Sequence, residues 1–150
     1  MTTNLTWDDL LIQSLPESDV RTWLGYWSGM ATGRVAPVFM SKFGDWFLRR
    51  PDGCTDELSV IEGTLTQIAS TPDDFASLVN TQAWQEQHLL SFQVARLHER
   101  GIIPHSGQCY AFAPHPALLG RIDLERVMLM EIGVWQSICA QQFSQLERTK

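Results

Sequence analysis

The sequence has no hydrophobic run long enough to cross a membrane, and it has few cysteines. No apolar stretch approaches the roughly 18 residues of a membrane span. The first nine residues contain no basic segment followed by an apolar one, so we predict no signal peptide. The three cysteines, Cys54, Cys109 and Cys139, are odd in number and form no CxxC pair, which favours reduced thiols over a disulfide framework. These absences predict a cytoplasmic protein.

Motifs of catalysis and metal binding are also missing. The sequence contains neither a G-x-S-x-G elbow nor a Gly-rich phosphate loop. His98, His105, Cys109 and His115 fall within 18 residues, but they lack the close pairing that is typical of zinc ligands. Cys109 lies in an apolar strand pattern and Cys139 on the apolar stripe of a helix, which favours buried, inert thiols. We expect a protein that is not an enzyme and has no cofactor or metal. A small metal-dependent enzyme is one alternative to this expectation.

Acidic side chains outnumber basic ones in the first half of the chain. The 150 residues are 44% hydrophobic and carry a net charge of −6, which suits a single globular domain. Residues 1–75 hold eleven acidic and five basic side chains, whereas the remaining residues hold six of each. An acidic surface repels nucleic acids and anionic membranes and attracts basic proteins. The alternative is that these charges only keep the surface solvated.

The residue pattern predicts an α+β fold. Expected helices cover 6–14, 17–27, a segment that begins at Thr71, 82–100 and 134–146. Expected strands cover 35–40, 45–50, 56–61, 64–69, 107–113 and 122–132. The order ααββββααββα predicts a mostly antiparallel sheet with helices packed on one face. Pro37 lacks a backbone donor, so the first of these strands is expected at an edge or with a bulge.

Six tryptophans are unusual for a chain of this length. Trp84 and Trp135 fit buried helical positions. Tryptophan is also favoured at the centres of protein interfaces, because it buries much area and offers one hydrogen-bond donor. The other four lie in the acidic half, where aromatic anchors inside an acidic rim would suit a basic protein partner: Trp7, Trp23, Trp27 and Trp46.

Several segments from Phe43 onward resemble those of a known family. They are Phe43–Leu48, Asp73–Phe75, Leu78–Asn80, Gly107–Phe112 and Pro114–Gly120. The order of these segments resembles the C-terminal domain family of immunity proteins that neutralise DNase toxins delivered by type VI secretion, which are SUKH-like in style. The resemblance covers residues 34–147 of a single domain spanning 1–150, and residues 1–33 form a helical N-terminal extension. It implies a non-catalytic fold that binds a toxin.

Our first hypothesis is therefore an immunity protein that binds a cognate, basic toxin. The expected charged rim, with Trp27 or Trp46 as its anchor, consists of Asp45, Asp52, Asp56, Glu57, Asp73 and Asp74. The alternative is a self-associating structural or regulatory module of a secretion or mobile-element locus. Leu89 and Phe92, which fall on the polar side of the expected helix over 82–100, would then form a homodimer patch.

Overall fold

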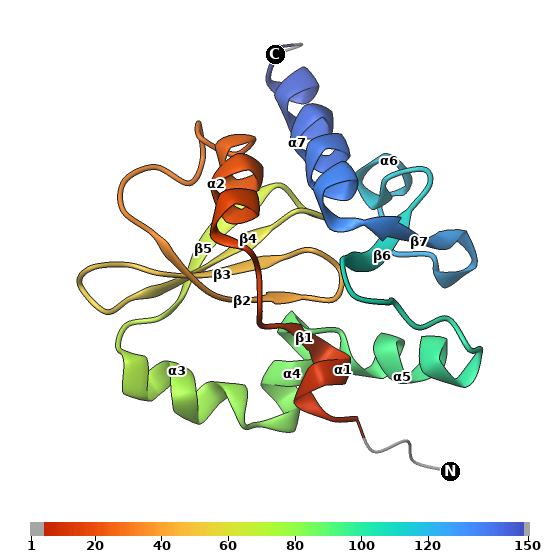
Figure 1. Cartoon of the computed structure of the whole chain (residues 1–150), viewed down its shortest axis with the longest axis horizontal. Helices are drawn as coiled ribbons and strands as arrows, with labels where there is room; N and C mark the ends of the chain where they lie inside the picture. The colour runs from red at the N-terminus through yellow and green to blue at the C-terminus, as the bar shows by residue number, and fades with distance from the viewer. Residues whose placement is uncertain (1–4, 149–150) are drawn as a thin grey trace.

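The computed structural model describes residues 5–148 and contains a five-stranded sheet, a separate two-stranded sheet and helices around both (Figure 1). In chain order, the elements are α1 (Trp7–Leu10), β1 (Leu11–Ile12), α2 (Glu17–Gly25), β2 (Ala36–Ser41), β3 (Trp46–Arg49), β4 (Thr55–Ser59), β5 (Thr64–Ala69), α3 (Pro72–Val79), α4 (Gln82–His88), α5 (Ser91–Glu99), β6 (Gln108–Phe112), α6 (Pro116–Leu119), a 3₁₀ helix (Leu124–Arg126), β7 (Val127–Glu131) and α7 (Ile132–Arg148). Among the helices of these described residues, none is long and apolar enough to cross a membrane.

The larger sheet is an antiparallel meander with the strand order β1-β2-β3-β4-β5. The α+β class and the mostly antiparallel sheet predicted from the sequence are confirmed. Pro37 lies where the register between β2 and β3 shifts, and β1 pairs only with Met40 and Ser41 at the far end of β2. The strand therefore accommodates its proline with a bulge, at a point where its other edge has no partner strand.

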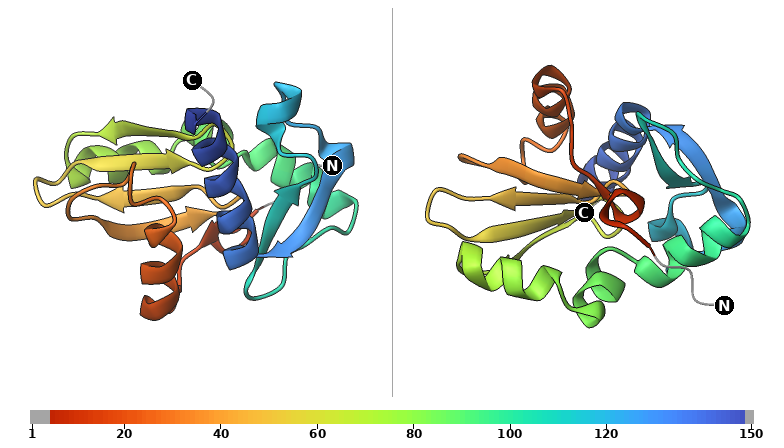
Figure 2. Two further views of the ribbon diagram at one scale, coloured as in Figure 1. Left: turned by 90° about the horizontal axis from the view of Figure 1, so that it is seen from above. Right: turned by 60° about the horizontal axis from the view of Figure 1, so that its bottom comes forward.

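One face of this sheet is covered by α3 and α4 (Figure 2). The α3 helix begins where the sequence predicts, because the Thr71 hydroxyl accepts a 3.1 Å hydrogen bond from the Asp74 N–H and proline occupies the first helical position. Its Phe75 ring lies 5.7 Å from Phe39 and meets the Trp84 ring of α4 edge-on. This aromatic layer fixes α3 and α4 to the sheet.

The opposite face of the sheet carries α7. Gln136 of this helix is buried, and its side-chain N–H donates a 2.7 Å hydrogen bond to the Gly44 carbonyl. The neighbouring Trp135 indole donates to the Phe43 carbonyl at 2.8 Å. Both carbonyls belong to the turn between β2 and β3, so this turn anchors the start of α7.

The two-stranded sheet packs against the same turn. The Tyr110 N–H of β6 donates to the Lys42 carbonyl at 2.8 Å, and the Phe43 ring lies 5.1 Å from Tyr110 and 6.0 Å from Phe112. Within the segment Gly107–Phe112 that the family resemblance marks, Cys109–Phe112 are accordingly buried scaffold, whereas Gly107 is exposed and precedes the strand. The turn 42–44 joins the two sheets and α7 into one core.

The helix expected over 82–100 is instead two helices, α4 and α5. Leu90 separates them with a left-handed backbone conformation (φ 54°), and Leu89 is fully buried. In a continuous helix, at 100° per residue, Leu89 would lie about 140° around the axis from Val94 and about 80° from Leu97, so the three side chains would not share one face. The break turns all three side chains into the core, and this burial outweighs the cost of a left-handed leucine.

Three other boundaries differ from the sequence prediction. The first helix ends at Leu10 rather than near 14, because the next two residues pair with β2 as β1. The strand expected over 122–132 is only β7, preceded by α6 and a 3₁₀ turn, and the last helix begins at Ile132. In each case a pairing or packing partner distant in sequence selects the local structure.

Candidate functional site

Three of the acidic residues expected at a partner surface lie close together and are exposed. Asp52 is in the β3–β4 turn, where its carboxylate accepts a 3.0 Å hydrogen bond from the Cys54 N–H, which lowers the pKa of Asp52. The turn packs against Pro72 at the start of α3. Asp73 and Asp74 follow in the first turn of that helix, and both are exposed. They favour the helix N-terminus electrostatically, which accounts for their position without a ligand.

Asp56 and Glu57 are half-buried, and each faces a base within the fold. Asp56 accepts a 2.8 Å hydrogen bond from the Arg50 guanidinium, and Glu57 lies 2.9 Å from the His88 ring on α4. The two carboxylates point to opposite faces of β4, as adjacent strand residues do. Replacing them with lysine would break these internal pairs, so such variants do not isolate a surface effect.

Asp45 is buried, so the prediction that it belongs to the charged rim of a partner surface is wrong. Its carboxylate accepts a 2.9 Å hydrogen bond from the Val60 N–H. Burial raises the pKa of Asp45 to about 8, and the nearby Glu57 carboxylate contributes to this rise. The residue closes the loop between β4 and β5 onto the turn after β2. Its role is structural.

The two tryptophans expected as anchors also lie in the core. The indole N–H groups of Trp27 and Trp46 both donate to the Gln136 side-chain oxygen, at 2.9 and 2.8 Å. Because both rings are buried and hydrogen-bonded internally, neither is available to a partner. The expected dimer patch is divided in the same way, since Leu89 is buried while Phe92 is 57% exposed.

The histidines and thiols considered for catalysis or metal binding are spread through the fold. Burial raises the pKa of the Cys109 thiol to about 12 and also raises that of Cys139. His115 is buried between the Val60 carbonyl, 2.9 Å from its Nε2, and the Ala117 N–H, which donates to its Nδ1. Within residues 5–148, no three His, Cys, Asp or Glu side chains are grouped to hold a metal ion.

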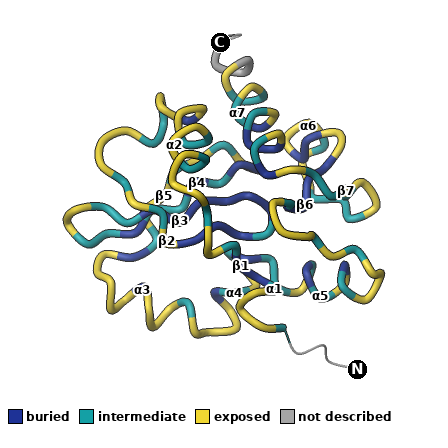
Figure 3. The backbone as a smooth tube through the Cα atoms, viewed as in Figure 1, coloured by how far each residue is buried: buried dark blue, intermediate teal, exposed yellow. Residues whose placement is uncertain are grey.

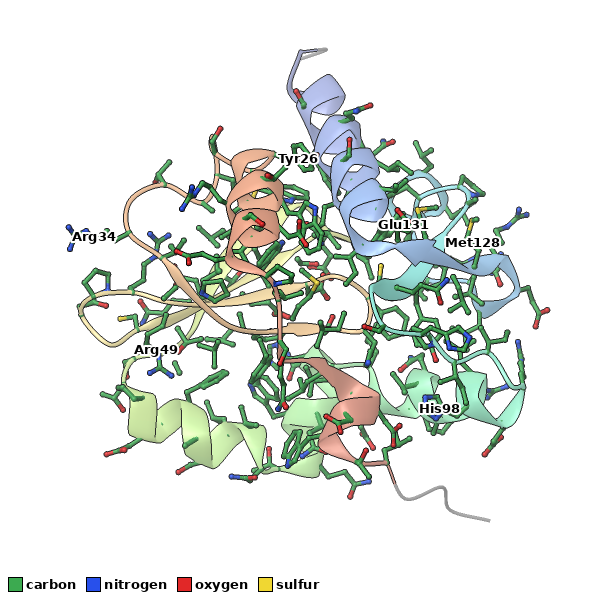
Figure 4. All side chains as sticks on the ribbon, in the orientation of Figure 1. Tyr26, Arg34, Arg49, His98, Met128 and Glu131 are labelled. Atoms are coloured by element: carbon green, nitrogen blue, oxygen red, sulfur yellow. The ribbon has the colours of Figure 1, made fainter. Side chains whose placement is uncertain are left out.

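An open groove of about 780 Å³ lies between α2, α7 and the loop that leads into β6. One wall is formed by Trp23 of α2 and by Tyr26, which follows the last residue of that helix, and the other by Val134 and Ile138 of α7. Figure 4 labels Tyr26 at the end of α2 and Glu131 at the junction of β7 and α7. The floor lies near Gly133, where an added Cβ would come within 2.5 Å of the Trp23 indole. The two helices therefore approach each other closely at the base of the groove.

The groove combines apolar walls with carboxylates. Tyr26, Val134 and Ile138 are 45%, 48% and 40% exposed, so much apolar surface faces solvent. Asp19 and Glu131 supply the charges, and the lining contains no lysine or arginine. An exposed apolar patch with a polar rim is typical of a protein interaction site. This groove is the best candidate for a functional site on the molecule.

The groove was not predicted from the sequence, although the apolar residues of the second helix give a sign of it. On α2, Trp23 and Tyr26 lie beside the stripe of Val20, Leu24 and Trp27 that packs towards the core, so the helix is apolar over more than one face. On α7, Ile138 is next to the buried Cys139 and is nevertheless 40% exposed. The missing information was that residues about 110 positions apart face each other.

The sequence matches no family model and no curated protein. The fold is similar to the crystal structure of Atu4351 from Agrobacterium tumefaciens, with a TM-score of 0.56 and 17% sequence identity. The similarity covers 86% of this chain and 65% of that chain, so this chain spans just under two thirds of its structural relative. At this identity the likeness shows the fold alone. Fold and groove together define an α+β protein with an exposed, acidic and apolar surface.

Proposed function

We propose that this chain is an immunity protein that acts in the cytoplasm by binding a cognate secreted toxin, without catalysis of its own. The expected toxin is a DNase delivered by type VI secretion. The observation that carries the proposal is the groove between α2 and α7, which exposes aromatic and aliphatic side chains beside two carboxylates and has no lysine or arginine in its lining. The family resemblance over residues 34–147 supports the same function.

Charge gives the proposal a physical basis. A DNase must be basic where it holds the phosphate backbone of DNA. An inhibitor with a net charge of −6 is attracted to such a surface, and its carboxylates can occupy the positions that DNA phosphates would take. Apolar contacts in the groove would then slow dissociation of the complex.

Co-expression with a flanking toxin gene tests this function. The genes on either side of this one are examined first, and the probe is the C-terminal domain of a flanking gene product that has a secretion-associated N-terminus and a nuclease-like end. We expect that domain to be lethal alone, to be tolerated when this chain is co-expressed, and to co-purify with it. Continued killing with both proteins present and folded, and no complex on size-exclusion chromatography, would refute the function.

Self-association is the second candidate function, and one observation favours it. Phe92 is 57% exposed on α5, with the Arg96 guanidinium 5.7 Å from its ring. Light scattering distinguishes the two functions: a mass that rises with concentration and returns to that of a monomer in Phe92→Ala would favour self-association. A monomer at all concentrations would remove it.

A further inference from the structure

The two walls of the groove are matching helical stripes. Asp19 and Trp23 of α2 are four residues apart, and Tyr26 follows three residues later with a backbone that is still helical at the C-cap, which places the three side chains on one side of the helix. Val134 and Ile138 share a side of α7 one turn apart, with Ser137 between them. These two stripes flank the groove on both sides, from Asp19 to Tyr26 and from Val134 to Ile138. The natural complement of the groove is a third helix, packed ridge into groove.

The walls lack a covering layer within the described chain. None of the nine residues of α2 is buried, as the tube coloured by burial also makes visible (Figure 3). A short amphipathic helix in a protein gains most of its stability from the packing of its apolar face. Because no residue of α2 is fully buried, its contacts with the rest of the chain stabilise it only in part. A helix laid over Tyr26, Val134 and Ile138 would remove their apolar surface from water and complete a three-helix layer.

The charges of the groove favour a partner segment that carries basic side chains. Asp19 and Glu131 face the groove, and the other titratable side chains in its lining are those of His105 and Tyr26. Arg21 lies two residues from Asp19, on roughly the opposite side of α2, and pairs with Glu17 at 3.9 Å. Arg34 and Arg49 lie at the other end of the molecule from Glu131 (Figure 4). A lysine or arginine in the occupant would therefore find two carboxylates without a competing fixed cation in the lining.

The openness of the groove argues for a macromolecule. A small-molecule site encloses most of its ligand, whereas here the wall residues Tyr26, Val134 and Ile138 remain 40–48% exposed. We infer that the groove between α2 and α7 binds an amphipathic basic helix of the toxin. Its apolar side chains lie between Tyr26 and Ile138, and a lysine or arginine reaches Asp19 or Glu131. This inference rests on the proposed function and adds to it the position of the interface and the chemistry of the partner segment.

The test measures binding of the adjacent-gene nuclease domain to four double variants by surface plasmon resonance. Tyr26→Ala/Ile138→Ala removes the apolar walls, and Asp19→Lys/Glu131→Lys reverses the charges of the groove. Asp73→Lys/Asp74→Lys reverses two exposed carboxylates at α3, and Phe92→Ala/Leu118→Ala removes exposed apolar side chains elsewhere. We expect both groove variants to raise Kd by about 100-fold. The two controls should stay within about threefold of the wild type.

Hydrogen–deuterium exchange on the wild-type complex is a second measurement. It uses no substituted protein, so a loss of folding in a variant cannot affect it. We expect binding to protect residues 19–26 and 134–138. If the wild type binds but the groove variants bind within threefold of it, or if protection falls elsewhere, the inference is wrong while the proposed function stands. If the wild type does not bind the domain, the proposed function fails, and the inference with it. A second copy of this chain as occupant would show as a dimer that Tyr26→Ala/Ile138→Ala dissociates, and would likewise overturn the inference.

Discussion

One amide side chain connects three distant parts of the fold. The Gln136 oxygen accepts from both Trp27 and Trp46, and its N–H donates to the Gly44 carbonyl. A buried polar group is costly when its partners are removed, because water cannot replace them. At the scale of single residues, this amide is the most connected polar side chain of the buried core.

Replacing Gln136 with leucine should destabilise the protein strongly. The change keeps a similar volume but leaves two buried indole donors and one carbonyl without partners, at a cost of about 3 kcal/mol or more. Urea unfolding followed by tryptophan fluorescence measures it. Gln141→Leu on the exposed side of the same helix is the matched control and should change the unfolding free energy by less than about 0.5 kcal/mol. Equal effects of the two substitutions would contradict the role assigned to Gln136.

Asp45 should make stability fall as pH rises. Its pKa is about 8 in the folded protein against an ordinary value of 3.8, because of its burial. Between these two values the unfolded chain is ionised at this position while the folded protein keeps the proton. Folding therefore binds a proton, and this group alone lowers the unfolding free energy by up to roughly 1.4 kcal/mol for each pH unit.

Asp45→Asn should remove that slope, since asparagine does not titrate. Urea midpoints from pH 5 to pH 8 measure the difference between variant and wild type. Asp8→Asn, at an exposed position on α1, is the control and should leave the slope of the wild type unchanged. A variant that follows the wild-type pH profile in parallel would show that Asp45 is ionised in the folded state.

At the scale of elements, local signals located some segments correctly and failed at others for identifiable reasons. The strand over 64–69 and the start of α3 follow from alternation and from the Thr71 cap, which act over a few residues. The break at Leu90 depends on what Leu89 meets in the core. The groove forms where α2 contacts α7. The sequence predicts each helix separately but does not show that the two are in contact.

The β4–β5 loop fits closely against α7, and glycine is required where they meet. Gly63 has φ 70°, and an added Cβ would lie 2.4 Å from the Phe143 ring. That ring cannot move freely because it lies 6.4 Å from the Trp27 ring and 5.3 Å from His115. Gly120 has nearly the same conformation, φ 71°, with nothing within 4 Å of the added atom.

Comparing Gly63→Ala with Gly120→Ala isolates this packing. Both variants bear the left-handed strain of about 1 kcal/mol. Only Gly63→Ala adds overpacking of about 1–3 kcal/mol, so we expect a lower thermal midpoint for it. Differential scanning calorimetry measures both. Equal midpoints would mean that the loop and α7 move apart without cost.

At the scale of the whole molecule, acidic side chains attract a basic partner, and those at the interface contribute more to this attraction than those elsewhere. We expect the association rate with the nuclease domain to fall at least tenfold between about 0.05 and 0.5 M salt, while the dissociation rate changes less than threefold. Stopped-flow fluorescence measures the first rate. Asp19→Asn/Glu131→Gln should flatten the salt dependence relative to Asp73→Asn/Asp74→Asn. A wild-type association rate insensitive to salt would exclude electrostatic steering.

The position of α7 has a consequence for biosynthesis. This helix supplies Trp135 and Gln136 to a turn and a sheet whose residues are made about 90 positions earlier. A nascent chain that has emerged only through β5 holds Trp27 and Trp46 with neither the apolar cover nor the hydrogen-bond acceptor that α7 brings. The native core therefore forms only after α7 has been made, and a ribosome stalled before residue 132 would present exposed apolar side chains that chaperones and proteases recognise.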